Sequence, residues 1–250
     1  MGNQTVTNQQ YDADHSPAVQ DYLQAIYRLE DGDAENERVT TSQLAERLDV
    51  RPASVTVMLQ KMAAASPALI DYHKSHGARL TAEGRLAALR VVRSHRLLEL
   101  YLHELLGYEW HEVHEEADRL EHVVSEAMLE RMAETLGHPT QDPHGHAIPS
   151  ADLTLEHTAT VALSELAEGE AAVVAHVADD DSDVLCRFDE IGLRPGTGIT
   201  VDERDAAGDW LALRVDGREP VRLGAVDAEH VHVVDGHMHG LDVRLMEAND

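Results

Sequence analysis

Residues 40–62, TTSQLAERLDVRPASVTVMLQKM, decide the first part of the fold because they read as two short helices joined by a tight turn. The first helix follows hydroxyl residues suited to capping, and its apolar stripe begins at Leu44. The second helix begins at Pro52, a residue favoured in a first helical turn, and its apolar stripe runs from Val55 to Met62. Two short helices joined this tightly predict a helix-turn-helix.

The segments on either side extend this module to a winged helix. Residues 69–81, LIDYHKSHGARLT, alternate apolar and polar side chains around a Ser-His-Gly turn, which predicts a β-hairpin. Upstream, apolar residues recur at helical spacing over 18–29, directly after a Ser-Pro start signal. Downstream, Thr81 is a capping residue for a long helix that we expect to run through Leu106.

Residues 111–132, HEVHEEADRLEHVVSEAMLERM, combine carboxylates and imidazoles at helical spacing, and we expect one helix from about 110 to 136. The helical pitch would place four metal-ligating side chains on one face: His114, Asp118, Glu121 and His122. A second stripe, expected to face a core, is apolar: Val113, Ala117, Leu120, Val124, Ala127 and Met128. In a chain with 47 acidic residues and 17 histidines, a solvated polar face is the alternative interpretation.

A second pair of candidate ligands, His95 and Glu99, has i,i+4 spacing on the preceding predicted helix and could form a cluster with His114. Carboxylates with one or two imidazoles and no thiolate favour Mn(II) or Fe(II) over a structural zinc. The only cysteine, Cys186, lies outside these motifs, and we expect it to be a small buried residue. The pattern indicates a site for a hard or borderline metal.

The chain changes character after Leu155, where five short β-type runs are separated by Gly, Asp and Pro. Five short strands in this length predict a small SH3-like barrel. Together with the helical first half, they place the chain in a multi-domain α+β class. The predicted order is an N-terminal winged helix-turn-helix, a helical metal-binding domain, and the small barrel.

The net charge of −27 at pH 7 is unevenly distributed. Between Arg38 and Arg96 the chain has ten Lys or Arg and four acidic residues, so the predicted winged helix is locally basic, as DNA binding requires. The remainder has 43 acidic residues against ten basic ones. Only two residues, Lys61 and Lys74, are lysines, and this composition resembles that of halophilic proteins, in which carboxylates keep the surface hydrated at high salt. An acidic functional tail is the alternative.

The polar N-terminus carries no hydrophobic signal region, and no apolar run approaches about 18 residues, the length that spans a bilayer. The sequence therefore predicts a cytoplasmic protein with no membrane partner.

A winged helix followed by HRLLE (95–99) and EVHEEADRLEHVVSE (112–126) resembles the diphtheria-toxin-repressor family of metal-dependent transcriptional regulators. The resemblance covers nearly the whole chain. It implies a winged-helix DNA-binding domain at 1–89, a helical dimerisation and metal-binding domain at 90–150, and an SH3-like domain at 155–240, with 241–250 as a tail.

The resemblance also implies site residues. It places the primary metal site at Asp21, Asp118, Glu121 and His122. It places an ancillary site at His95, Glu99 and His114, with contributions from the acidic run Asp179, Asp180, Asp181 and Asp183. The manganese branch has carboxylates at the positions of Asp21 and Asp118, which favours Mn(II), but it has a further Glu where this chain has Gln24. The implied DNA contacts are Arg51, Ala53, Ser54, Thr56, Lys61, Lys74, His76 and Arg79.

We therefore expect a homodimeric regulator, activated by Mn(II) or Fe(II), that binds double-stranded DNA at a palindromic operator and represses metal uptake or homeostasis genes. One alternative is a metal-assisted hydrolase, although no nucleophile elbow, phosphate loop or HExxH motif accompanies the cluster. Another is a DNA-binding protein whose metal site is purely structural. Metal titration in a DNA-binding assay distinguishes these three hypotheses.

Overall fold

A computed structural model describes residues 15–32, 38–156, 158–178 and 181–235. The chain forms two compact units. The first contains Met1–Leu97, Asp118–His138 and Pro149–Thr154, and the second contains Leu98–Ala117, Pro139–Ile148 and Leu155–Asp250. The predicted tail at 241–250 lies outside the described residues.

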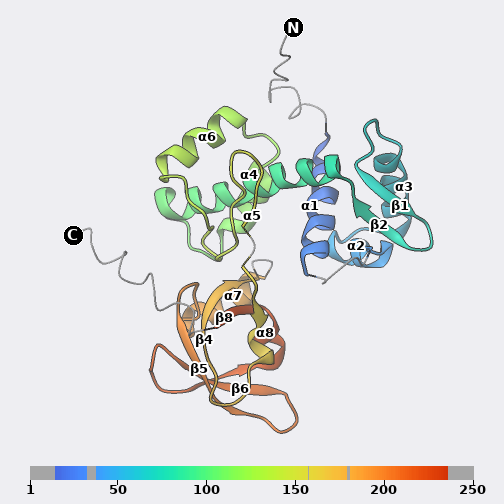
Figure 1. Ribbon diagram of the computed structural model, residues 1–250. Coiled ribbons are helices and arrows are strands. Elements are labelled where there is room, and N and C mark those ends of the chain that lie inside the picture. Colours follow the sequence, from blue (N-terminus) through green and yellow to red (C-terminus); the bar gives the residue numbers. More distant parts are fainter. Residues whose placement is uncertain (1–14, 33–37, 157, 179–180, 236–250) are drawn as a thin grey trace. The chain divides into compact units, whose positions relative to one another are not determined.

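Three helices begin the first unit (Figure 1): α1 (Pro17–Gly32), α2 (Thr41–Arg47) and α3 (Pro52–Ala63), of which α2 and α3 form the predicted helix-turn-helix. The Thr40 side chain accepts a hydrogen bond from the Gln43 backbone N–H, and the Gln43 side chain accepts one from Thr40 N–H in return, which fixes the start of α2. Helix α3 buries the stripe Val55, Leu59 and Met62 as the spacing predicts.

The wing is the antiparallel hairpin of β1 (Ile70–His73) and β2 (Gly77–Leu80), with Ile70 opposite Leu80. Gly77 has φ +86°, and a Cβ at this position would come 2.3 Å from the Val39 carbonyl oxygen. Only glycine therefore allows the hairpin to approach the segment before α2 this closely. This confirms the predicted winged helix.

The helical segment after the wing comprises α4 (Ala82–Leu106), α5 (Val113–Leu120) and α6 (Glu126–Thr135). Thr81 begins α4, since its side chain accepts a hydrogen bond from Gly84 N–H at 3.1 Å. No helix in the described part of the chain combines the length and apolar character needed to cross a bilayer.

The single helix predicted over 110–136 is wrong, because the chain leaves the helix after Leu120 and re-enters it at Glu126. Ser125 is the reason: its side chain accepts a hydrogen bond from Met128 N–H and caps a new helix. The predicted apolar stripe is correspondingly correct at Val113 and Ala117, which are buried, and wrong at Ala127 and Met128, which are exposed.

The second unit contains a six-stranded antiparallel sheet in the order β3-β8-β4-β5-β6-β7. The strands are β3 (Val161–Ala162), β4 (Ala171–Val177), β5 (Gly198–Arg204), β6 (Trp210–Val215), β7 (Val221–Gly224) and β8 (Val231–Asp235). All five predicted β runs are strands. The sheet encloses one apolar core that includes Phe188, Leu185, Leu163 and Trp110, all fully buried.

Two helices of this unit were not predicted: α7 (Ser182–Ile191) and the short α8 (Ala225–Glu229). Figure 1 shows both beside the orange-to-red strands. The side chain of Asp181 accepts hydrogen bonds from the backbone N–H groups of Asp183 and Val184 and begins α7. The acidic run that the sequence analysis treated only as a source of ligands therefore contains a helix cap.

Candidate metal centre

The first group of candidate ligands, called the first cluster, comprises Asp21, Glu121 and His122, whose ligand atoms lie within 4.8 Å of one another. Asp21 lies on α1, while Glu121 and His122 lie in the turn that follows α5. His122 Nε2 lies 2.9 Å from Asp21 Oδ1. The break after Leu120 thus directs Glu121 and His122 toward α1 from a turn, not from a continuous helix face.

The imidazole of His122 is oriented by Gln20, one residue before Asp21 on α1. His122 Nδ1 lies 2.7 Å from Gln20 Oε1, an amide oxygen that can only accept a hydrogen bond. His122 Nδ1 therefore donates to Gln20, and Nε2 is the nitrogen that faces Asp21 and is available to a metal. Holding the remote nitrogen in this way is how proteins orient imidazole ligands of metals.

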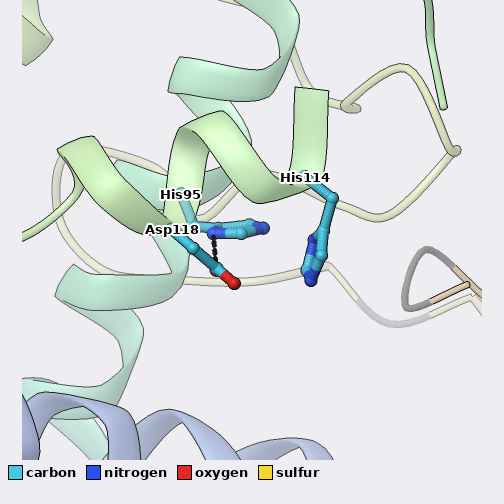
Figure 2. Close-up of side chains that lie close together, drawn as sticks. All are labelled: His95, His114 and Asp118. Carbon is cyan, nitrogen blue, oxygen red and sulfur yellow. Dashed lines mark ion pairs between the residues drawn. The ribbon is translucent and has the colours of Figure 1, made fainter. Parts of the chain in front are cut away.

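His95 and Asp118 extend the first cluster on the side of Glu121. His95 is fully buried, and its Nδ1 lies 2.8 Å from Glu121 Oε2 and 3.2 Å from Asp118 Oδ1. Figure 2 shows the second of these pairs, with His95 projecting from α4 and Asp118 from α5. Gln24 Nε2 also donates to Glu121 Oε2 at 3.4 Å. A connected set of carboxylates and imidazoles therefore links α1, α4 and α5.

The electrostatics of the first cluster favour a bound cation. Burial raises the pKa of the Asp21 carboxyl above its usual range, and the nearby charges of Glu121 and Asp118 raise it further, while His122 opposes the shift. Three carboxylates that repel one another when ionised are stabilised together by a divalent cation among them. The donors are carboxylate oxygens and imidazoles, with no thiol, and this set fits Mn(II) or Fe(II).

The second group, called the second cluster, comprises Glu99, Asp142 and His144, with ligand atoms within 4.8 Å of one another. All three residues are buried. Glu99 lies on α4, and the other two lie in the loop at 139–148. His114 joins them, since its Nδ1 lies 3.1 Å from Glu99 Oε1. Buried carboxylates are stable only when paired or bound to a cation, so this cluster is a second candidate metal site.

The loop that carries Asp142 and His144 is held firmly against β4. Val177 N–H donates to the His144 carbonyl at 3.0 Å, and Gly145, with φ +90°, approaches so closely that a Cβ would come 2.1 Å from the Ala175 carbonyl oxygen. His144 Nε2 lies 2.8 Å from the Trp110 carbonyl oxygen and must donate to it. The lone pair of His144 Nδ1 consequently faces Glu99, 3.7 Å from Oε2.

The structure divides the predicted ligand sets differently from the sequence analysis. Asp21, Glu121 and His122 come together as predicted, whereas Asp118 pairs with His95. Glu99 contacts His114 as predicted, but it also meets Asp142 and His144, to which the sequence analysis gave no metal role. The signal that could have identified them is DPHGH (142–146), which places a carboxylate and two imidazoles in one tight loop.

The acidic run does not supply a clear ligand within the described residues. Asp179 and Asp180 lie outside those residues. Asp181 uses its carboxylate to cap α7, and Asp183 is exposed.

The residues predicted to contact DNA lie on the reading helix α3 and on the wing. Seven of the eight are exposed, namely Arg51, Ala53, Ser54, Lys61, Lys74, His76 and Arg79. Thr56 is half-buried, and its hydroxyl donates to the Pro52 carbonyl at 3.1 Å, so one hydroxyl bond is already used within the helix. On the wing, the Arg38 guanidinium hydrogen-bonds to Asp71 and holds the pKa of that carboxyl below its usual range.

Comparison with known protein families supports the same arrangement. Residues 14–78 match the iron-dependent repressor N-terminal DNA-binding domain, and residues 81–150 match the iron-dependent repressor metal-binding and dimerisation domain. Residues 161–235 match the FeoA domain.

Full-length relatives show how far the similarity extends. The iron-dependent repressor IdeR of Mycobacterium leprae is 33% identical over 214 residues, which is 81% of this chain and 90% of that protein. The diphtheria toxin repressor of Corynebacterium efficiens is 30% identical over 190 residues, covering 72% of this chain and 80% of the relative.

Among solved structures, a manganese-dependent transcriptional repressor in complex with manganese has a TM-score of 0.80 and 35% identity, covering 87% of this chain and 99% of that one. The IdeR of T. acidophilum has a TM-score of 0.71 and 27% identity, covering 86% and 97%.

Proposed function

Because this chain belongs to the family of iron-dependent repressors, and is thus a metal-dependent DNA-binding transcriptional repressor, we propose that the first cluster is its regulatory metal site. Asp21, Glu121 and His122 would hold Mn(II) or Fe(II), the metals named for relatives of this chain. The observation that carries the proposal is the 2.9 Å approach of His122 Nε2 to Asp21. This family consists of transcriptional repressors, so we set aside the alternative of a metal-assisted hydrolase.

The position of Asp21 explains why occupancy of this site would change DNA binding. Asp21 lies on α1, the helix that precedes the helix-turn-helix, whereas Glu121 and His122 lie in the turn between α5 and α6. A cation shared by these side chains supplies charge neutralisation between α1 and that turn, so it stabilises the arrangement in which all three ligands meet. Binding free energy can then select one position of α1 and, through it, of α3.

We assign His95 and Asp118 to the same region because His95 contacts Glu121 at 2.8 Å and Asp118 contacts His95 at 3.2 Å. They can act as further ligands or can orient Glu121. We assign the second metal site to Glu99, His114, Asp142 and His144, whose buried carboxylates and imidazoles form the same kind of donor set.

The DNA partner is expected at the exposed face of α3 and the wing. We propose a homodimer that binds a palindromic operator, because a two-fold protein presents two reading helices to two half-sites. The proposal uses three predicted domains, 1–89, 90–150 and 155–240, and the three matched ranges support this division. Since the DNA target of such a repressor is in the cytoplasm, we infer that the protein works there.

The test is a metal titration of DNA binding. Selection from a random duplex library with Mn(II) present would supply a DNA site, and fluorescence anisotropy would then give the affinity with Mn(II), with Fe(II) under anaerobic conditions, and with chelator. We expect metal to tighten binding about 5- to 150-fold. His122→Ala should remove this response, while His230→Ala, at an exposed position of the second unit, should retain it. Equal affinity with chelator and with metal would indicate the structural-site alternative.

A further inference from the structure

Three histidines of the second unit form a row that the function described so far does not use. His176 on β4 and His232 on β8 are opposite each other in the sheet register, and their ring centroids lie 4.5 Å apart. His146, from the loop at 139–148, meets His176 edge-on with centroids 4.9 Å apart. All three side chains are only half-buried. The set His146, His176 and His232 is called the histidine row.

The histidine row leads directly to the second cluster. His146 Nδ1 lies 3.5 Å from Asp142 Oδ2, and Asp142 is a member of that cluster. At the other end, His232 lies on β8 and is only half-buried. Imidazoles therefore follow one another from the half-buried His232 through His176 and His146 to the buried second cluster.

The burial of the second cluster makes such a series of ligands useful. Glu99 and His144 are 0% exposed and Asp142 is 5% exposed, so a hydrated ion reaches them only by way of partly exposed neighbours such as His114 or His146. A divalent ion gives up water only when protein donors replace it, and imidazole is a suitable donor for borderline ions. Half-buried imidazoles whose rings contact one another can replace the water molecules of the ion one after another.

The row is also held in place. The backbone bond from Val177 to the His144 carbonyl and the close approach of Gly145 to Ala175 fix the loop against β4. His146 is thereby kept beside His176, and the register of β4 with β8 keeps His176 beside His232.

We propose that the histidine row is the loading path by which a divalent metal reaches the second cluster, a proposal that rests on that cluster binding metal. The ion is captured at His232, exchanges to His176 and His146, and then passes to Asp142. At each step one imidazole nitrogen bonds to the ion as a water or the previous imidazole leaves, so no oxidant, reductant or other reactant is needed.

A path differs from a binding site in its kinetics. Residues that the ion only passes change the height of the barrier and not the free energy of the bound state. Their loss must therefore slow loading and release by the same factor and leave the equilibrium affinity unchanged. A variant that merely disturbs the fold would change affinity.

Trp110 provides a local reporter, because its carbonyl accepts the His144 hydrogen bond and its ring centroid lies 5.5 Å from that of His144. In a full-length Trp210→Phe background, stopped-flow mixing with Mn(II) would follow quenching of Trp110, and a chelator chase would follow release. We expect His176→Gln to slow both rates about tenfold, which corresponds to about 1.4 kcal/mol of barrier, with the titration midpoint unchanged. His232→Gln should have the same effect, and the matched control His230→Ala should have none.

If His176→Gln and His232→Gln both load and release Mn(II) at the rates of the parent protein, the path is wrong, and the ion reaches the second cluster from the side of His114. Slower release with a shifted midpoint would make His176 a ligand instead. If Mn(II) quenches Trp110 in neither the parent nor the variants, the second metal site itself is wrong, whereas the DNA response of the first cluster would still stand.

Discussion

Replacing His95 with leucine tests the contact at the centre of the first cluster. The His95 side chain is 0% exposed and that of Glu121 is 2% exposed, and they meet at 2.8 Å. Removing one partner of a buried pair costs about 3–5 kcal/mol, because the other group is left buried. Here Glu121 keeps His122 at 3.7 Å and Gln24 at 3.4 Å, so we expect His95→Leu to lower the free energy of unfolding by about 2–3 kcal/mol in the presence of chelator.

The measurement is urea unfolding followed by circular dichroism, with Asp118→Asn as the matched control. That substitution also removes a partner of His95, but the Asp118 side chain is 52% exposed and water replaces the contact, so the loss should stay below about 1 kcal/mol. Adding Glu121→Leu to His95→Leu should recover part of the loss, since no carboxylate is then left buried. A loss below about 0.5 kcal/mol for His95→Leu would refute the argument that His95 stabilises the Glu121 carboxylate.

Asp118→Cys replaces a hard ligand with a soft one and should weaken the Mn(II) response of DNA binding relative to Co(II) or Zn(II), as anisotropy titrations would show. Gly145→Ala would place a Cβ 2.1 Å from the Ala175 carbonyl oxygen and should lower the free energy of unfolding by about 1–3 kcal/mol, which a lower melting temperature would show. An unchanged melting temperature would contradict the close approach. Burial, with help from the nearby charge of His146, lowers the pKa of the His232 imidazole below its ordinary value of 6.5. The unfolded chain therefore binds the proton at a higher pH than the folded chain, so the free energy of unfolding should fall as pH drops below 6.5, and by less in His232→Phe than in the parent. Salt weakens both the attraction of arginine for phosphate and the repulsion of DNA by the acidic surface. Operator affinity should therefore change little between about 0.1 and 3 M KCl, while thermal stability should rise over that range. A steep loss of affinity with salt, together with highest stability in dilute buffer, would exclude the halophilic interpretation.

The elements that the sequence predicts well are those in which one local rule dominates. The capping residues Thr40 and Thr81, the Pro52 start of α3 and the alternation of the wing each act within a few residues, and the structure confirms all of them. The five β runs are equally local, because buried strands with many β-branched residues are short and bounded by turn residues.

The break between α5 and α6 is hard to predict from the sequence because two local signals compete. In the sequence, the helical spacing of apolar residues continues through Val124 and outweighs the capping signal of Ser125. In the structure the Ser125 cap prevails, and the two β-branched residues before it lie in the turn.

The first cluster was predictable only in part. Residues on one segment, such as Glu121 and His122, follow from spacing, but Asp21 is about 100 residues away in the chain and was assigned by family resemblance. Asp142 and His144 depend on a loop packed against β4 through Gly145, and no short-range periodicity reports such a contact.

The placement of the two clusters in the chain has a functional consequence. Asp21, Glu121 and His122 belong to the unit that contains the reading helix α3, whereas Glu99, Asp142 and His144 belong to the unit that contains the six-stranded sheet. A cation at the first cluster joins α1 to the turn after α5, so its binding free energy acts on the helices that read DNA. A cation at the second cluster joins α4 to a loop held against β4, so its binding free energy stabilises that loop and the sheet. Occupancy of the first cluster should therefore control DNA affinity, and occupancy of the second should control the stability of the sheet-containing unit. His122→Ala and Asp142→Ala separate the two effects, since each removes a ligand from one cluster alone.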